Sequence, residues 1–326
     1  MEIYRLLKEK RAEWIYRRES IQKVKRNNNL PGNVRYFNYW GQQDFQHKWF
    51  SRFLKYHTNL NNEVSVAVFS VFGHRSALKY ADGDIKIFYT GENVRNRHLQ
   101  YADNMLGDKT INLSLGFDYF EDERYLRFPL WMQYMFEPDW SIAQIKEKIS
   151  RLRNPYIESR KKFCSLIASH DFYGIREKIV SQINQIDYIH CAGKFKHNDD
   201  TLLNIYNDDK LHYLNQFIFN ICPENTNSYG YVTEKIFECI ECGCIPIYWG
   251  SYNDPEPEIL NKDAILFFLP DSENKQLLSQ IEFLYSHPKV MIEFMHQPRL
   301  RSSAEDYILS RFEQLSKKMN ELIGGR

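Results

Sequence analysis

The chain has 326 residues, which is enough for two domains of about 150 residues with separate cores. Its 43 basic and 42 acidic side chains leave a net charge of +1, so no overall field recruits nucleic acid. No apolar run is long enough to cross a bilayer and no signal-peptide core is present, so we expect a cytoplasmic protein, and six cysteines fit reduced thiols better than a disulfide framework.

The first region, residues 1–30, is predicted to be a basic amphipathic helix. Residues 1–26 carry nine Lys or Arg against four Glu, and Leu7, Trp14 and Ile21 recur every seven residues. A solvated helix that packs on the body by one stripe explains this pattern. A helix lying on the anionic inner face of a membrane, with Trp14 at the boundary, is the alternative. Nucleic-acid binding is a third interpretation, but the segment contains no module of aromatic and basic residues that would support it.

The second region, residues 31–155, alternates between predicted strands and helices, as expected for a parallel sheet covered on both faces. The pair Asn154-Pro155 stops a helix and marks the predicted domain boundary. The predicted strands are 34–39, 64–72, 85–89 and a short one closing at 127–130, and the predicted helices are 44–56, 94–105 and 141–152.

The third region, residues 156–300, repeats this alternation and predicts a second parallel sheet. Residues 301–326 are predicted to form a C-terminal helix, mainly over 303–322. The predicted strands are 162–169, 188–191, 217–221, 244–250 and 264–269, and the predicted helices are 174–186, one opening at 231, and 273–285.

A strand, loop and helix over residues 216–251 predict an anion site. The apolar run ends in a polar loop that holds Glu224, Asn225 and Gly230, and a helical pattern opens at Tyr231. At the carboxyl edge of a parallel sheet, the free N–H groups and dipole of a helix favour phosphate.

Spacing within that predicted helix puts Tyr231, Glu234, Lys235 and Glu238 on one face, opposite an apolar stripe. An ordinary solvated face with an internal Glu/Lys pair is the simpler interpretation. The apolar strand 244–250 that follows favours a βαβ unit instead, with the polar face available for binding.

These residues carry a family resemblance. The segment YGYVTEKI, followed by IPIYWGS, resembles the signature of the α-1,3/1,4-fucosyltransferases, which use GDP-fucose, and IFYTGEN at 87–93 is similar to the acidic motif of their other domain. The resemblance runs from about Val34 to about Phe312. It implies a bacterial-type soluble member with two Rossmann-like domains facing across a cleft, the GT-B type of glycosyltransferase. Residues 31–155 would then be the acceptor side and residues 156–300 the GDP-fucose side.

The resemblance also implies a reaction: inverting transfer of L-fucose from GDP-fucose to a hydroxyl of N-acetylglucosamine in a glycan such as N-acetyllactosamine. An α-1,3 linkage is expected, as in Lewis-antigen or surface-polysaccharide synthesis, and α-1,4 stays open. The acceptor is not identified by the sequence. A transferase for another GDP-sugar, and a non-catalytic module that binds glycans or nucleotides, are the alternatives.

Glu92 is the predicted catalytic residue. It follows a buried strand and a glycine, and a carboxylate there can accept the proton of an attacking hydroxyl. The alternative from the residues alone is that Glu92 caps a helix beginning nearby. The resemblance favours the catalytic base.

Donor and acceptor contacts are also predicted. Lys235 and Arg176 would neutralise the departing diphosphate, although Arg176 alone would fit a surface salt bridge. By resemblance, Asn225, Tyr231 and Glu234 would hydrogen-bond the ribose, the diphosphate or the fucose. His74 and Arg75 are weaker candidates for acceptor binding, and their assignment rests only on their place in the first domain.

A metal is not expected to be required, although added manganese could stimulate activity. Asp82-Gly83-Asp84 has the spacing of a metal-binding Asp-x-Asp but precedes a strand and fits a turn. Asp199-Asp200 and Asp208-Asp209 fit solvated loops. The cluster Cys239, Cys242 and Cys244 has no second pair at zinc spacing.

Overall fold

The computed structural model describes residues 2–40, 48–95, 99–157 and 160–325. These residues form two compact units: unit 1 comprises Met1–Trp140 with Ser310–Arg326, and unit 2 comprises Ser141–Leu309. The units therefore divide before α4 (Ile142–Arg153), whereas the sequence suggested a boundary after it. The reason is that α4 packs within unit 2, where Lys148 pairs with Glu241 of α8 (Glu234–Glu241).

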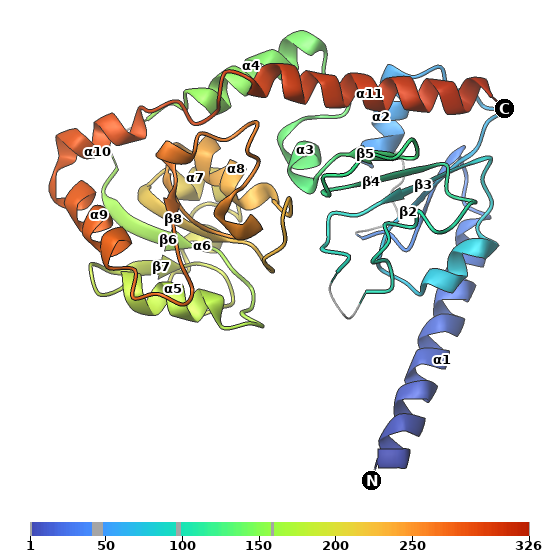
Figure 1. The fold of residues 1–326 in the computed structure, drawn as a ribbon, viewed down its shortest axis with the longest axis horizontal. Helices are drawn as coiled ribbons and strands as arrows, with labels where there is room; N and C mark the ends of the chain where they lie inside the picture. Colours follow the sequence, from blue (N-terminus) through green and yellow to red (C-terminus); the bar gives the residue numbers. More distant parts are fainter. Residues whose placement is uncertain (1, 41–47, 96–98, 158–159, 326) are drawn as a thin grey trace. The chain divides into compact units, whose positions relative to one another are not determined.

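Unit 1 contains a five-stranded parallel sheet in chain order, β1-β2-β3-β4-β5 (Figure 1). Its strands are buried on both faces, as the near-continuous apolar runs predicted. The strands are β1 (Val34–Phe37), β2 (Val66–Phe69), β3 (Ile85–Tyr89), β4 (Leu113–Gly116) and β5 (Tyr125–Arg127). The helices are α1 (Glu2–Asn27), α2 (Trp49–His57), the 3-10 helix η2 (Arg75–Tyr80), α3 (Leu130–Met135) and the later part of α11 (Ala304–Gly324).

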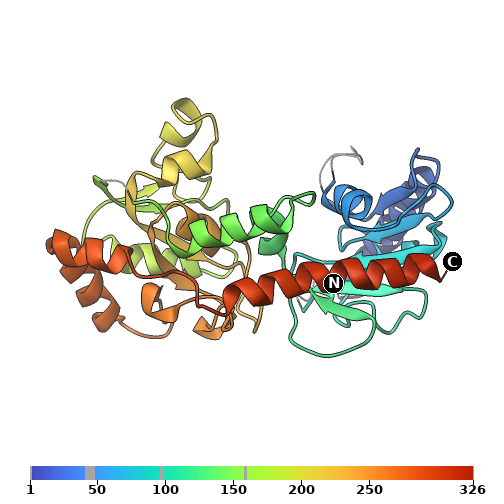
Figure 2. The ribbon, with the colours of Figure 1, turned by 90° about the horizontal axis from the view of Figure 1, so that it is seen from above.

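The end of the chain packs into unit 1 through aromatic side chains. Phe312 of α11 lies 6.2 Å from Trp49 of α2 and 5.6 Å from Phe128, measured between ring centroids. Asn320 accepts a hydrogen bond from the backbone N–H of Asn59. Figure 2 shows α11 in red; its residues 304–309 belong to unit 2 and its residues from 310 onward belong to unit 1.

One predicted helix of unit 1 is wrong. In the 94–105 segment, the described residues form turns, and residues 96–98 lie outside the described part of the chain. Asn104 and Met105 have left-handed φ values of 50° and 61°. The Asp103 carboxylate accepts hydrogen bonds from the N–H groups of Met105 and Gly107, which fixes a turn where helical spacing was expected.

The N-terminal helix α1 packs only by its last turns. Ser20, Val24 and Asn27 are buried, and Asn27 donates to the backbone carbonyl of Tyr36 at 2.8 Å. The earlier described side chains, from Tyr4 onward, are exposed, including Trp14 at 58%. Figure 1 shows α1 extending away from the rest of unit 1.

Unit 2 contains a second five-stranded parallel sheet, in the order β10-β9-β8-β6-β7. The chain runs from β6 outward to β7, then returns to the other side of β6 and continues through β8 and β9 to β10. The order therefore reverses between β6 and β8. The strands are β6 (Lys162–Leu166), β7 (Ile189–Cys191), β8 (Phe217–Pro223), β9 (Ile245–Trp249) and β10 (Leu266–Phe267).

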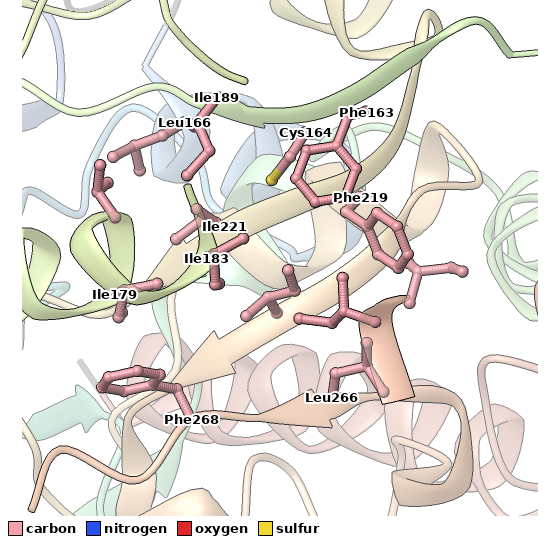
Figure 3. Packing of buried hydrophobic residues seen from close by; sticks show 14 of the residues in the cluster. Phe163, Cys164, Leu166, Ile179, Ile183, Ile189, Phe219, Ile221, Leu266 and Phe268 are labelled. Carbon is pink, nitrogen blue, oxygen red and sulfur yellow. The ribbon is translucent and has the colours of Figure 1, made fainter. Parts of the chain in front are cut away.

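Helices cover both faces of this sheet. On one face, α5 (Ile175–Ile183), α9 (Lys275–Ser286) and α10 (Pro288–Met295) share one apolar cluster with the strands, part of which Figure 3 shows. On the other face, α8 packs on β8 and β9. The short helices α6 (Thr201–Asn204) and α7 (Lys210–Leu214), yellow in Figure 2, precede β8. The expected α/β class with two parallel sheets is confirmed.

Candidate functional site

A cavity of about 260 Å³ lies at the carboxyl edge of the unit 2 sheet. Its walls come from the loop after β6, the first turn of α5, the end of β8 and the helices α7 and α8. This is the place where the strand order reverses, and the loops after β6 and β8 therefore leave in opposite directions. The lining side chains include four basic ones, His170, Arg176, Lys210 and Lys235, and two acidic ones, Glu234 and Glu238.

Arg176 is held in the first turn of α5. The helix begins after Gly174, whose φ of 71° suits glycine and turns the chain into α5. The Arg176 guanidinium donates to Asn225 Oδ1 at 2.8 Å and to the backbone carbonyl of His170. Burial lowers the pKa of Arg176 from its ordinary value. A desolvated cation fixed by neutral acceptors is well placed to receive an anion.

Lys235 is held at the start of α8 by a network of which the sequence indicated only a Glu/Lys pair. Its Nζ donates to Thr233 Oγ1 at 2.8 Å and lies 3.7 Å from Glu224 and 3.3 Å from Glu234. Burial lowers the pKa of Lys235, but the two carboxylates outweigh that effect, and its net pKa is raised. The ammonium therefore stays charged in a partly buried site.

Glu224 organises the start of α8. The fully buried carboxylate accepts from Thr233 N at 2.8 Å and from Thr233 Oγ1 at 2.6 Å. These bonds hold Thr233 extended, so α8 begins at Glu234 and not at Tyr231 as predicted. The Thr233 hydroxyl consequently does not cap the helix, and the first N–H groups of α8 receive no side-chain cap from it.

The two residues that follow β9 contact the loop between β8 and α8 and fix its shape. Gly250 has a φ of 147°, and a Cβ there would lie 2.6 Å from the side chain of Glu224. The next residue, Ser251, accepts a hydrogen bond from the N–H of Gly230 at 3.0 Å. The Gly250-Ser251 pair of the IPIYWGS segment therefore shapes the loop between β8 and α8.

Glu238 faces the cavity one turn further along α8. Its side chain is 18% exposed, and its nearest cation is Lys210 Nζ of α7 at 3.9 Å. Burial raises the pKa of Glu238 to about 7, with Lys210 opposing the shift. The sequence placed Glu238 on the polar face but gave it no role. It did not indicate Lys210 as a residue of the site, because α7 was not predicted. His170 follows a predicted strand, which is the signal that would have identified it.

The other predicted donor residues are placed as follows. Asn225 and Glu234 line the cavity together with Arg176 and Lys235. Tyr231 is buried, and it is not among the residues that line the cavity. It lies in the loop before α8, outside the helix on which its predicted position depended.

The predicted acceptor residues make intramolecular contacts in unit 1. The His74 ring accepts from Ser76 N and caps η2, and its backbone N–H donates to Ser20 of α1. Burial lowers the pKa of His74. Arg75 binds Asp103 through two bonds of 2.9 and 3.0 Å. Both residues support the packing of η2 in unit 1.

Glu92 lies at the carboxyl edge of the unit 1 sheet, in the turn after β3. The buried Thr90 hydroxyl accepts from Glu92 N at 3.0 Å and donates to Glu92 O at 2.8 Å, which fixes the backbone of this turn. The Glu92 side chain is half-buried. No described residue directly after Glu92 is helical, so the helix that it was alternatively expected to cap is not seen at 93–95.

Two of the acids considered as metal ligands bind other groups of the chain. Asp84 accepts from Ser65 N and Oγ, and Asp199 bonds to His190, Thr201 and Tyr213. All six cysteines are buried and unpaired. Across the described ranges, no three His, Cys, Asp or Glu side chains gather in an arrangement suited to a metal ion. Over the same ranges, no helix has both the length and the apolar character to span a bilayer.

The arrangement of unit 2 defines a class: an open parallel α/β sheet with a charged cavity at its topological switch point. Family models match most of the chain. Residues 34–134 match the model of the "Alpha-(1,3)-fucosyltransferase FucT N-terminal domain", and residues 157–313 match "Glycosyltransferase family 10 (fucosyltransferase) C-term". The chain belongs to this fucosyltransferase family, as its sequence resemblance predicted.

Individual relatives give the same result. The chain is 25% identical over 320 residues to the α-(1,3)-fucosyltransferase FucT of Helicobacter pylori, covering 87% of this chain and 63% of that protein. It is 27% identical over 179 residues to α-(1,3)-fucosyltransferase B of Drosophila melanogaster, covering 54% of this chain and 36% of that protein. The chain thus spans less than two thirds of the length of these relatives.

Solved structures share the fold. A crystal structure of an α1,3-fucosyltransferase superposes with a TM-score of 0.59 at 21% identity, covering 87% of this chain and 89% of that chain. A crystal structure of an α1,3-fucosyltransferase with GDP-fucose gives 0.54 at 19% identity, covering 91% and 97%. The GT-B type of fold, with two parallel-sheet units, is therefore confirmed.

Proposed function

We propose that this chain is an inverting glycosyltransferase that moves L-fucose from GDP-fucose to a hydroxyl of N-acetylglucosamine in a glycan, forming an α-1,3 linkage. The acceptor class is an N-acetyllactosamine-like glycan. The observation that carries the proposal is the pair of fixed cations, Arg176 and Lys235, in a cavity at the switch point of a Rossmann-like sheet. Membership of the fucosyltransferase family supports fucose as the sugar.

The two cations would act on the leaving group. As the bond between fucose and phosphate breaks, negative charge grows on the diphosphate of GDP. Arg176 and Lys235 are already oriented by Asn225, Thr233 and Glu224, so they need little rearrangement to stabilise that charge. Because two cations are in place, we propose that no metal is required, with manganese at most stimulatory.

Glu92 would act on the acceptor. The attacking hydroxyl forms a bond to the anomeric carbon while the bond to GDP breaks, and the hydroxyl proton passes to the Glu92 carboxylate. A single displacement of this kind converts a β-linked donor into an α-fucoside. The fixed turn at Thr90 and Glu92 suits a base that has to be held in one position.

The test is a donor panel with an N-acetyllactosamine acceptor. Released GDP is measured for GDP-fucose and for other GDP-sugars, and the configuration of the product is read by NMR. GDP release only with GDP-fucose, and an α-fucoside product, support the proposal. Faster release with another GDP-sugar would assign a different transferase, and binding of GDP without turnover for any donor would assign a non-catalytic module.

We further propose that α1 rests on an anionic membrane surface, with the enzyme cytoplasmic and peripheral at the inner face. A groove of about 280 Å³ along α1 has Trp14 and Ile21 in its wall and three cations, Arg17, Arg18 and Lys25, around it. Exposed Leu6 and Leu7 extend the apolar surface. Cations beside apolar side chains complement anionic lipid, and six unpaired cysteines fit a reducing compartment.

Vesicle sedimentation tests this surface. The full chain should sediment with phosphatidylglycerol vesicles and not with phosphatidylcholine vesicles. Trp14→Gln with Arg17→Gln and Arg18→Gln should abolish sedimentation while turnover on a soluble acceptor stays near the parental rate, because the exposed turns of α1 contribute little to the core. Equal sedimentation of the parent and the triple variant would contradict the membrane role.

A further inference from the structure

The charges of the unit 2 cavity are arranged along α8. Lys235 lies in the first turn, and Arg176 of α5 also lines the wall. Glu238 follows four residues after Glu234 on the same face, about 6 Å further along the axis. Beside it, α7 contributes Lys210 and the apolar Leu214. The cavity thus offers cations at the start of α8 and a carboxylate beside apolar surface one turn away.

The glutamates around this cavity differ in what they bind. Glu224 accepts two hydrogen bonds from Thr233, and Glu234 accepts one from Lys235 at 3.3 Å. Glu238 differs from both: among the residues that the structure describes, none donates a hydrogen bond to it, and Lys210 stays at 3.9 Å. The carboxylate of Glu238 is largely buried, and a cation at 3.9 Å replaces only part of the hydration that it loses. A ligand that brings N–H groups would replace the rest.

Guanine brings the matching donors. Its N1–H and its N2 amino group lie side by side and point in the same direction, so that both oxygens of one carboxylate can accept from them. Adenine presents an acceptor at N1, and uracil presents a single N–H between two carbonyl oxygens. With the diphosphate at Arg176 and Lys235, the nucleoside would extend along α8 toward Glu238.

We propose that Glu238 selects the base of the donor nucleotide, accepting hydrogen bonds from N1–H and the N2 amino group of guanine. This inference rests on the proposed binding of GDP-fucose in the same cavity. Lys210 is a positioning residue, because its charge favours the ionised form of Glu238 without forming a hydrogen bond to it. The apolar Leu214 beside it would contact the base.

The first experiment uses the parent protein and calorimetric titration with GDP, IDP, ADP and 2′-deoxy-GDP. IDP lacks only the N2 amino group, so it should bind about tenfold more weakly than GDP, and ADP more weakly still. The 2′-deoxy nucleotide should bind nearly as well as GDP. IDP binding within twofold of GDP would overturn the proposal, and so would a large loss confined to the 2′-deoxy nucleotide, which would assign Glu238 to the ribose.

The second experiment compares Glu238→Gln with the control Glu241→Gln, the same change one turn on, at a residue that pairs with Lys148 and does not line the cavity. Glu238→Gln should lose at least about tenfold in GDP affinity with ADP affinity unchanged, so the preference for guanine collapses. Glu241→Gln should keep the parental preference for GDP over ADP. A parent that binds no nucleotide refutes the proposed function, whereas an unchanged GDP to ADP ratio in Glu238→Gln refutes only this inference.

Discussion

The sheet of unit 1 runs in chain order from β1 to β5, whereas the sheet of unit 2 runs β10-β9-β8-β6-β7 and reverses between β6 and β8. In unit 2, loops leave the reversal in opposite directions, and a cavity lined by charged side chains lies between them. In unit 1, the corresponding edge carries a tight turn at Thr90 and Glu92. The difference follows from the strand order, which decides where a crevice can form at the edge of a parallel sheet.

In the proposed reaction, the two units have different roles. Unit 2 would hold the diphosphate with its two oriented cations, and unit 1 would supply the base, Glu92, from a turn whose backbone is fixed by Thr90. Variants of the cations in unit 2 should therefore change donor affinity as well as turnover, whereas a variant of Glu92 in unit 1 should change turnover alone.

The largest effect is expected for Glu92→Gln. The amide keeps the shape of the side chain but cannot accept a proton at neutral pH, so turnover should fall by about 100-fold or more with GDP affinity unchanged. Transfer to N-acetyllactosamine and calorimetric GDP binding are measured on the same preparation. Glu63→Gln, an exposed glutamate of the same unit, is the control. Near-parental turnover in Glu92→Gln would assign the base to another residue.

Lys235→Ala should have the next largest effect, in the other unit. Loss of a charge-assisted contact to the diphosphate costs roughly 1.5–3 kcal/mol, or about 10- to 150-fold in GDP affinity. Arg176→Ala should act in the same direction. The control is Lys275→Ala, whose side chain is 83% exposed.

Lys235→Ala also leaves Glu224 buried without its cation, which costs stability. The double variant Lys235→Ala/Glu224→Gln removes that charge, so it separates lost folding from lost binding. Thermal unfolding of both variants should show a higher midpoint for the double variant, with GDP affinity still low. Parental GDP affinity in a folded double variant would exclude Lys235 from the donor site.

The sequence predicted local structure better than the site. The strand 85–89 has the predicted bounds, because all of its residues except Lys86 are apolar or aromatic and buried, and it ends at a Thr-Gly turn. The helix at 94–105 failed, because Asp103 and two left-handed residues outweigh the apolar spacing. Lys235 was found from a contiguous motif. Glu238 was placed on the polar face but given no role, because its surroundings come from Lys210 on an unpredicted short helix and from a strand order that no local pattern encodes.

Donor affinity should depend on pH through Glu238. Burial raises its pKa to about 7, and guanine requires the ionised form, so affinity for GDP-fucose should fall about tenfold from pH 8 to pH 6. GDP-fucose is the probe because both of its phosphates are esterified and do not titrate in this range. Other charges near Glu238 are Lys210, Glu234, Lys235 and Glu241.

His170 is the other titrating group of the cavity, and burial and nearby cations lower its pKa below the ordinary value. Its protonation at low pH would add positive charge and strengthen diphosphate binding, opposite to the effect of Glu238. The difference between the parent and Glu238→Gln therefore isolates Glu238. In the variant, affinity should be flat or rise slightly toward pH 6. The same fall in both proteins would locate the titration elsewhere.

Stability should change in the opposite direction to binding. Because the folded pKa of Glu238 lies above the unfolded value, the ionised form is disfavoured in the native state. That penalty is absent below the unfolded pKa, grows as the pH rises, and is complete above about 7. Glu238→Gln should therefore unfold at a higher temperature than the parent at pH 8 and at a similar temperature at pH 4. A lower midpoint for the variant at pH 8 would show that the carboxylate stabilises the fold.

The smallest effect is expected from chelation. If Arg176 and Lys235 together neutralise the diphosphate, a divalent cation adds little, and EDTA should leave transfer nearly unchanged while manganese raises it modestly at most. The same measurement of transfer with EDTA and with manganese is then repeated on Lys235→Ala, which lacks one of the two fixed charges. Manganese should then restore part of the lost turnover, because a mobile cation can replace some of the missing charge. If EDTA instead abolishes transfer by the parent and manganese restores it, the diphosphate is held by a metal, and Asp82, Asp84, Asp199 and Asp200 become the residues to substitute.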